Sequence, residues 1–291
     1  MKNLKRVIAL IMAMAMMLAF ASCGSSDEEA ADTASSNKIK LVDYALTEEE
    51  YAYGVDKNNP ELLQQLNAFI AQINEDGTME TIMNNYFGDG TPVGVALGTE
   101  DASKDQLIIS SNLEFAPFEY MEGDMAYGVD MEVMKAFADS LGKELVIKNM
   151  EFDAVLTYID AGYGDIAASG LTKNEAREAY VTFSDSYYSA CQYIIVKDTD
   201  TRFDACTDLA SVEAVLNGLD SSVKIGCQNG TTGKLYIEGD ADWDFAGLPA
   251  TAMGYSNGAL AVQDMLNGNI DFVIIDEAPA KSLVEKYNAM A

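Results

Sequence analysis

The chain has 291 residues, a formal net charge of −29 and no histidine. So acidic a chain is poorly suited to bind nucleic acid, because that binding depends on Lys and Arg neutralising phosphates. The lack of His excludes nucleophile systems and metal sites that use imidazole. We therefore expect no enzymatic activity, no cofactor and no metal.

The N-terminus has the pattern of a lipoprotein signal peptide over residues 1–22. A short basic region precedes an apolar run at 7–20, which is shorter than the roughly 20 residues that cross a bilayer. Residues 18–23 (LAFASC) resemble a bacterial lipobox, in which Cys23 is acylated and becomes the new N-terminus. An ordinary cleavage site with an incidental Cys is the alternative reading.

Residues 23–38 are expected to form a flexible tether. Their Gly, Ser, Ala, Asp, Glu and Thr residues include no aromatic side chain that could drive collapse. A diacyl group on Cys23 supplies two chains, which is enough for stable attachment. We therefore expect the protein at the cell surface, anchored to the outer face of the cytoplasmic membrane.

Residues 38–105 begin with strands expected at 38–42 and 51–55. Pro60 then opens a helix, since its missing N–H is unpaired at the first helical position anyway. Asp76-Gly77-Thr78 ends this helix and starts another. Residues 88–105 are rich in Gly, Asp and Thr and are expected to form a linker.

From residue 106 onward strands and helices alternate, which predicts an α/β fold with mostly parallel sheets. Strands are expected at 107–110, 145–147, 165–169, 192–197, 223–227 and 272–275, and helices at 131–141, 152–161, from 232, at 257–267 and at 278–286. Between them lie Cys191, Cys206 and Cys227, whose spacing matches no metal pattern. Either one disulfide, such as Cys206–Cys227, or three thiols fits this spacing.

Residues 106–291 resemble the bacterial extracellular solute-binding proteins of the polar amino-acid type, family 3. The matching motifs are 115–120 (FAPFEY), 128–132 (GVDME), 169–172 (SGLT) with Arg177, 183–188 (FSDSYY), 228–232 (QNGTT) and 267–276 (NGNIDFVIID). The resemblance implies a two-lobed periplasmic-binding-protein-like (type II) fold, with two hinge strands joining lobes built on flanked sheets. It also implies a monomer that binds a free amino acid and delivers it to an ABC permease.

The order of the motifs indicates a circular permutation. Residues 46–55, 59–63, 76–78 and 85–88 resemble the C-terminal end of the family, which is missing after residue 288. Residues 88–105 would join the usual termini, and a fragment of a duplicated domain is the alternative. Under the permutation, lobe 1 comprises 51–197 and lobe 2 comprises 39–50 plus 198–291, with hinge strands at 51–55 and 192–197. Residues 39–43 should then share a sheet with 272–275.

An amino acid is a zwitterion, so its receptor needs a cation and an anion close together. Arg177 stands at the family's carboxylate-binding arginine, and a guanidinium can hold a carboxylate with two parallel hydrogen bonds. Asp276 follows an apolar strand at the position that takes the α-ammonium; the alternative is a cap on the helix at 278. The resemblance adds further ligand contacts from Ser169, Gly170, Thr172, Thr231 and Thr232.

Side-chain contacts are expected from Phe115 and Phe152, which match the positions that sandwich the ligand. Asn112 stands where binders of basic amino acids carry Asp. An amide cannot neutralise a cation, so we expect a polar or neutral ligand. Two other functions stay in view: a secreted dehydratase-like enzyme on the same fold, and a ligand-sensing partner of a membrane receptor.

Overall fold

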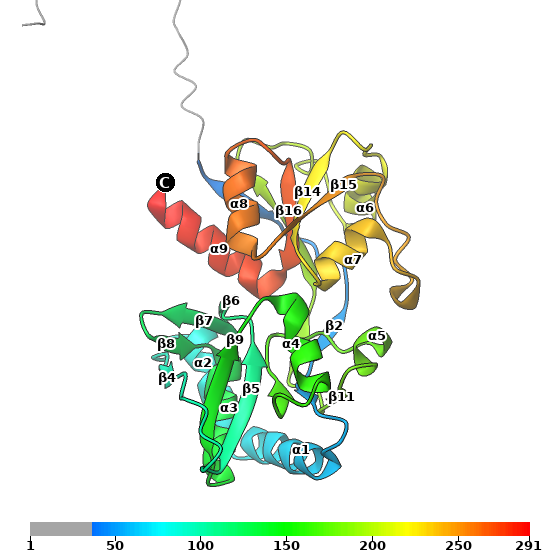
Figure 1. Ribbon diagram of the computed structural model, residues 1–291. Coiled ribbons are helices and arrows are strands. Elements are labelled where there is room, and N and C mark those ends of the chain that lie inside the picture. The colour runs from blue at the N-terminus through cyan, green and yellow to red at the C-terminus, as the bar shows by residue number, and fades with distance from the viewer. Residues whose placement is uncertain (1–36) are drawn as a thin grey trace, which may run out of the picture. The chain divides into compact units, whose positions relative to one another are not determined.

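The computed structural model describes residues 37–291. The predictions for the signal peptide, acylated Cys23 and all but the end of the tether lie outside the described residues. Two five-stranded sheets dominate the described part and define two lobes (Figure 1). The helices are α1 (Pro60–Glu75), α2 (Thr78–Phe87), α3 (Val129–Ser140), α4 (Phe152–Asp160), α5 (Glu175–Glu178), α6 (Leu209–Asn217), α7 (Thr232–Glu238), α8 (Gly258–Leu266) and α9 (Glu277–Met290).

Lobe 1 is built on the sheet ordered β11-β3-β10-β5-β9. Its strands are β3 (Gly54–Val55), β5 (Gln106–Ser111), β9 (Glu144–Asn149), β10 (Ile166–Ala167) and β11 (Thr182–Phe183). Helix α4 packs on β5 and β10, and α3 packs on β9. Helix α1 begins as predicted: Pro60 is its first residue, and the side chain of Asn59 accepts a hydrogen bond from the Leu62 N–H. Such caps stabilise a helix by about 1 kcal/mol.

Lobe 2 is built on the sheet ordered β1-β13-β16-β14-β15. Its strands are β1 (Ile39–Val42), β13 (Gln192–Lys197), β14 (Lys224–Gln228), β15 (Thr251–Tyr255) and β16 (Phe272–Asp276). Strand β1 pairs with β13, which pairs with β16. The prediction that residues 39–43 share a sheet with 272–275 is therefore confirmed. The side chain of Asn288 in α9 also hydrogen-bonds the N–H and the carbonyl of Ile39, each at 2.9 Å.

The two sheets have the same plan. In each, three neighbouring strands are parallel: β10, β5 and β9 in lobe 1, and β16, β14 and β15 in lobe 2. The other two strands join antiparallel. The parallel strands of each lobe end close to the boundary between the lobes, and the carboxyl ends of such strands are where α/β folds bind ligands.

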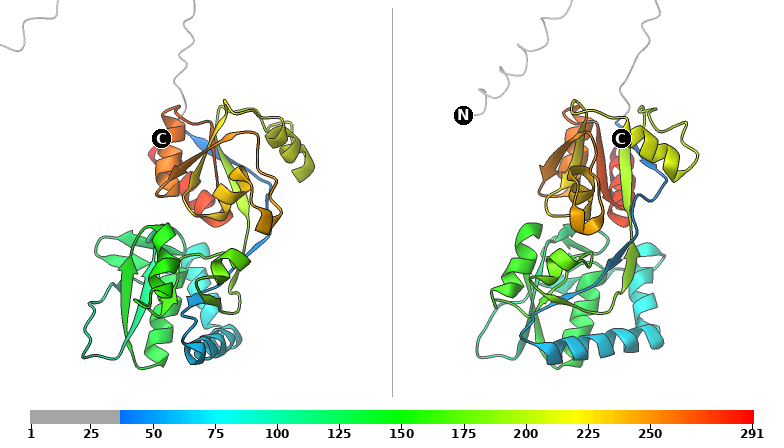
Figure 2. Two further views of the ribbon diagram at one scale, coloured as in Figure 1. Left: turned by 45° about the vertical axis from the view of Figure 1, so that its right-hand side comes forward. Right: turned by 90° about the vertical axis from the view of Figure 1, so that its right-hand side faces the viewer.

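The chain crosses between the lobes at a short antiparallel pair, β2 (Glu49–Tyr51) with β12 (Tyr188–Ala190) (Figure 2). The expected hinge range 51–55 overlaps this pair at Tyr51, but its Gly54–Val55 belong to the sheet of lobe 1. The other expected hinge range, 192–197, belongs to the sheet of lobe 2, so the predicted end of lobe 1 at residue 197 is wrong. An apolar strand has the same sequence pattern whichever sheet it joins. The apolar pattern therefore does not show where the chain passes from one sheet to the other.

A four-stranded antiparallel sheet, ordered β4-β8-β7-β6, completes lobe 1. Its strands are β4 (Val95–Ala96), β6 (Glu114–Phe115), β7 (Glu119–Glu122) and β8 (Met125–Tyr127). The expected linker at 88–105 thus contributes strand β4, which pairs with β8. Within residues 37–291, Cys191, Cys206 and Cys227 are free thiols, and no helix of this part is long and apolar enough to cross a membrane.

Candidate functional site

A small cavity lies where the two lobes meet. It is lined by Phe115, Phe152, Gly170, Thr172, Arg177, Gln228, Thr231, Thr232 and Asp276. Every residue predicted for the site lines this cavity except Asn112 and Ser169. These two are buried beside it and hydrogen-bonded to each other, the Asn112 N–H donating to Ser169 Oγ at 3.0 Å. Residues from separate parts of the chain are thus brought together.

Arg177 is held by main-chain carbonyls of both lobes. Helix α5 presents it after Asn174, whose side chain accepts from the Arg177 N–H. Its Nη1 donates to the carbonyl of Thr172 at 2.7 Å, and its Nη2 donates to the carbonyl of Gly230 at 3.0 Å. Burial lowers the pKa of Arg177, and its guanidinium lies 5.4 Å from the ring centre of Phe152. The cation is therefore fixed in orientation, with other N–H groups left for an anion.

Asp276 supplies the carboxylate of the cavity. It ends β16 and precedes α9, but its side chain makes no capping hydrogen bond. Asp276 therefore stands at the N-cap position of α9 without capping the helix through its side chain. Its Oδ1 instead accepts from the hydroxyl of Tyr51 at 2.7 Å. Burial and the nearby charge of Glu49 raise the pKa of Asp276 to about 7.

Glu49 is a buried carboxylate near the site, and it was not predicted from the sequence. It accepts hydrogen bonds from the hydroxyl of Thr172 at 2.7 Å and from the side-chain amide of Gln192 at 3.0 Å. The signal is weak, because Glu49 is the middle residue of three consecutive glutamates. Only the alternation of β2, in which Glu49 and Tyr51 are buried and Glu50 is exposed, separates it from its neighbours.

Two of the three threonines of the site join the lobes, and the third fixes a turn of lobe 2. The hydroxyl of Thr232 donates to the hydroxyl oxygen of Thr172 at 3.3 Å, across the lobe boundary. Thr231 precedes α7, but its side chain makes no capping bond and donates instead to the carbonyl of Gln228 at 2.9 Å. Thr231 thus fixes the turn that follows β14.

Ser169 and Gly170 are each hydrogen-bonded to a buried carboxyl group. The hydroxyl of Ser169 donates to Glu119 at 3.0 Å, and the N–H of Gly170 donates to Asp130 at 2.9 Å. Burial raises the pKa of both acids, that of Asp130 to about 6. Gly170 has a φ of +49°, and a Cβ there would lie 3.0 Å from the ring of Phe115. Glycine is therefore required for this close approach.

Asn112 and Gln228 form a direct hydrogen bond between the lobes. Asn112 follows β5 in lobe 1, and Gln228 ends β14 in lobe 2. The Gln228 side-chain amide donates to Asn112 Oδ1 at 3.0 Å. Asn112 therefore lies beside the cavity, bonded to Gln228, and Gln228 is a cavity residue to which the sequence assigned no role.

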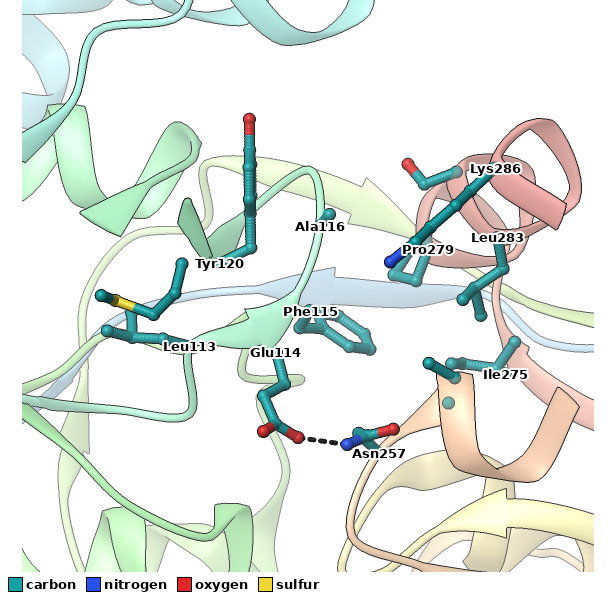
Figure 3. Close-up of a pocket in the computed structure, with 14 residues that line it drawn as sticks. Leu113, Glu114, Phe115, Ala116, Tyr120, Asn257, Ile275, Pro279, Leu283 and Lys286 are labelled. Carbon is teal, nitrogen blue, oxygen red and sulfur yellow. Dashed lines mark hydrogen bonds between the residues drawn. The ribbon is translucent and has the colours of Figure 1, made fainter. Parts of the chain in front are cut away.

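A larger cavity of about 360 Å³ lies on the other side of Phe115 (Figure 3). Its lining comes from both lobes and includes Leu113, Tyr120, Ile275, Leu283 and Lys286. Asn257 of lobe 2 donates a hydrogen bond to Glu114 of lobe 1 at its edge. Phe115 lines both cavities and is the one predicted site residue in the larger one. Over residues 37–291, no group of acidic or cysteine side chains is placed to hold a metal ion.

Comparison with known proteins finds a family match over most of the chain. Residues 8–89 and 107–288 match the family described as "Bacterial extracellular solute-binding proteins, family 3". The chain is similar to the arginine-binding extracellular protein ArtP of Bacillus subtilis (strain 168), with 34% identity over 41% of this chain and 46% of the relative. A probable histidine-binding protein of Neisseria gonorrhoeae is 26% identical over 61% of each chain. The aligned parts thus span about half the length of these curated relatives.

A solved structure gives a further likeness. The amino acid ABC transporter substrate-binding protein AbpA of Streptococcus pneumoniae, in its form bound to L-arginine, superimposes with a TM-score of 0.53 and 31% identity. The superposition covers 63% of this chain and 72% of the other. The two-lobed type II fold is thereby confirmed.

Proposed function

Because the chain belongs to the bacterial extracellular solute-binding proteins of family 3, we propose that it binds a free α-amino acid and delivers it to an ABC importer. One observation carries the amino-acid proposal: a guanidinium, Arg177, and a carboxylate, Asp276, line the same small cavity from different lobes. This pairing matches a zwitterion, whose two charges are separated by a single carbon.

The proposed pose follows from hydrogen-bonding capacity. The ligand carboxylate binds the guanidinium of Arg177, which can donate two parallel bonds, with Thr172, Thr231 and Thr232 around it. The α-ammonium binds Asp276. Phe115 and Phe152 cover the side chain of the ligand, and Ser169 with Gly170 complete the wall on the side of lobe 1.

A polar, uncharged side chain is the ligand class that the site favours. Asn112 carries an amide where binders of basic amino acids carry Asp, and its cavity neighbour Gln228 is also an amide. A pair of neutral amides offers no countercharge to a buried guanidinium or ammonium, and an unpaired charge there is unfavourable. Two of the relatives, ArtP and AbpA, are described with arginine. Arginine is therefore the ligand whose binding would most clearly argue against a neutral side chain.

Closure follows from contacts on both lobes. Arg177 belongs to lobe 1 and Asp276 to lobe 2, so a ligand that bridges them binds most tightly when the lobes are together. Such a ligand shifts the population toward the closed arrangement. In this proposal the closed form, a monomer, is what docks on the permease.

Two further parts of the proposal concern the tether and the chain order. Acylation at Cys23 would hold the protein on the outer face of the cytoplasmic membrane, and mass spectrometry of the mature protein checks for the acyl groups. The circular permutation is supported by the family match in two separate stretches and by the place of β1 beside β13. A chain running from 106 to 291 and then from 39 to 87 should fold and bind the same ligand.

A thermal-shift panel of the twenty amino acids tests the proposed function. We expect one or a few amino acids with polar, uncharged side chains to raise the unfolding temperature, because a ligand of the folded state stabilises it by mass action. A panel in which no amino acid stabilises the protein would contradict the proposal. Consumption of an added cyclic hydroxy acid would instead favour the dehydratase-like alternative.

A further inference from the structure

We propose that Gln228 selects the side chain of the ligand and that it requires an N–H donor, so that the preferred ligands end in a carboxamide. The inference rests on the amino-acid binding proposed above and narrows it to a chemical class. It comes from a chain of three groups, the carbonyl of Met150, the side chain of Asn112 and the side chain of Gln228.

The chain of hydrogen bonds has one possible direction. A carbonyl oxygen can only accept, so Asn112 must present its amide nitrogen to Met150, at 2.9 Å. Asn112 Oδ1 is then the atom that faces Gln228, and Gln228 must present its own nitrogen to it, at 3.0 Å. The oxygen and nitrogen of a side-chain amide are otherwise hard to tell apart. Here the Met150 carbonyl determines both orientations.

The result is a buried acceptor without a partner. Gln228 is 1% exposed, lines the cavity, and its Oε1 has no hydrogen-bond partner among residues 37–291. Of the buried side-chain atoms unpaired in this part of the chain, Gln228 Oε1 alone belongs to a residue that lines the small cavity. A buried unpaired acceptor is unfavourable, and a ligand N–H that donates to Gln228 Oε1 removes this penalty.

The other polar groups of the cavity already have tasks. Arg177 and Asp276 take the two charges of the zwitterion. The threonine hydroxyls are bonded within the protein: that of Thr231 to the Gln228 carbonyl, that of Thr172 to Glu49 and that of Thr232 to Thr172. Gln228 Oε1 is thus left for the side chain of the ligand.

This acceptor ranks the ligands. The carboxamide of glutamine or asparagine donates to it without bringing a charge. Glutamate offers only acceptors, which face Oε1 unfavourably, and methionine leaves Oε1 unpaired. The guanidinium of arginine donates well, but the neutral Asn112–Gln228 pair does not balance its charge. We expect carboxamides first, arginine next, and methionine and glutamate last.

Calorimetric titrations of glutamine, glutamate, methionine, arginine and alanine test the ranking. The wild-type protein should bind glutamine about 10- to 100-fold more tightly than methionine, the range for one well-placed hydrogen bond in a buried site. In Gln228→Met, glutamine and methionine should bind within about threefold of each other. In Asn112→Ala the Gln228 amide is free to turn over, so the preference for glutamine over glutamate should fall by about tenfold or more.

Gln263→Met is the matched control, because Gln263 is exposed on α8 and its replacement should change no affinity. Thermal unfolding confirms that each variant is folded. If Gln228→Met weakens the binding of alanine as much as the binding of glutamine, Gln228 contacts the main-chain part of the ligand. The inference is then overturned, while the proposal of amino-acid binding stands. If the wild-type protein prefers methionine or glutamate, the inference is also overturned. Binding of none of the five ligands by the folded wild-type protein overturns the proposed function itself.

Discussion

Replacing Arg177 by alanine is expected to weaken binding of the best amino acid by at least about 100-fold. Two hydrogen bonds from a guanidinium to a carboxylate are each worth about 1.5–3 kcal/mol, and every 1.4 kcal/mol is a factor of ten in affinity. The variant also removes the donors that bridge the carbonyls of Thr172 and Gly230, and so removes one link between the lobes. Isothermal titration of the amino acid found in the thermal-shift panel measures the loss.

Two companion variants give this result its meaning. Arg202→Ala removes a half-buried arginine that pairs with Asp200 and Asp271, packs over the ring of Phe272 and lines neither cavity, and it should leave affinity unchanged. Arg177→Lys keeps the charge but loses the planar two-bond geometry, and we expect its affinity for the amino acid to fall by about tenfold. An Arg177→Ala protein that binds within about threefold of wild type would show that the ligand carboxylate does not use this residue.

Amino-acid affinity is expected to rise as the pH is raised from about 5 to about 7.5. The carboxyl group of Asp276 has a pKa of about 7, raised by burial and by Glu49, and only its ionised form pairs with the α-ammonium. Below that pKa the affinity should therefore fall by up to about tenfold per pH unit, because binding must release a proton. Titrations at four or five pH values measure the slope.

The stability of the free protein, unlike the affinity, should fall as the pH is raised. A carboxyl group whose pKa rises on folding, from 3.8 to about 7 for Asp276, stabilises the fold fully below the lower value. That contribution is lost as the pH rises through the higher value. Asp276→Asn should remove the pH slope of binding and leave the protein folded. Wild-type affinity that is flat or falls between about pH 5 and 7.5 would contradict the assignment of Asp276 to the ammonium.

The main helices and strands could be predicted because their patterns are strong. Helix α1 has a Pro start and regular apolar spacing, while β13 and β16 are almost continuously apolar. Strands β4, β6, β7 and β8 were missed because they are two to four residues long and mixed in character. Such strands form because the rest of lobe 1 places them side by side. The longer α6 and β15 of lobe 2 were missed as well.

The site could be predicted as a set of residues but not as a network. The motifs around Arg177 and Asp276 point to the two charges, and the structure places both at one cavity. The roles of Asn112 and Gln228 depend on a hydrogen bond between residues 116 positions apart. Glu49 likewise depends on which face of β2 is buried. Neither the bond between Asn112 and Gln228 nor the burial of Glu49 can be read from the neighbouring residues in the sequence.

The most direct test of the central claim is a crystal structure of the protein with the amino acid that stabilises it most. We predict density for the ligand in the small cavity, with its carboxylate on the guanidinium of Arg177, its ammonium within hydrogen-bonding distance of Asp276 and its side chain between Phe115 and Phe152. A ligand bound instead in the larger cavity beside Lys286, or turned with its ammonium toward Arg177, would contradict the account.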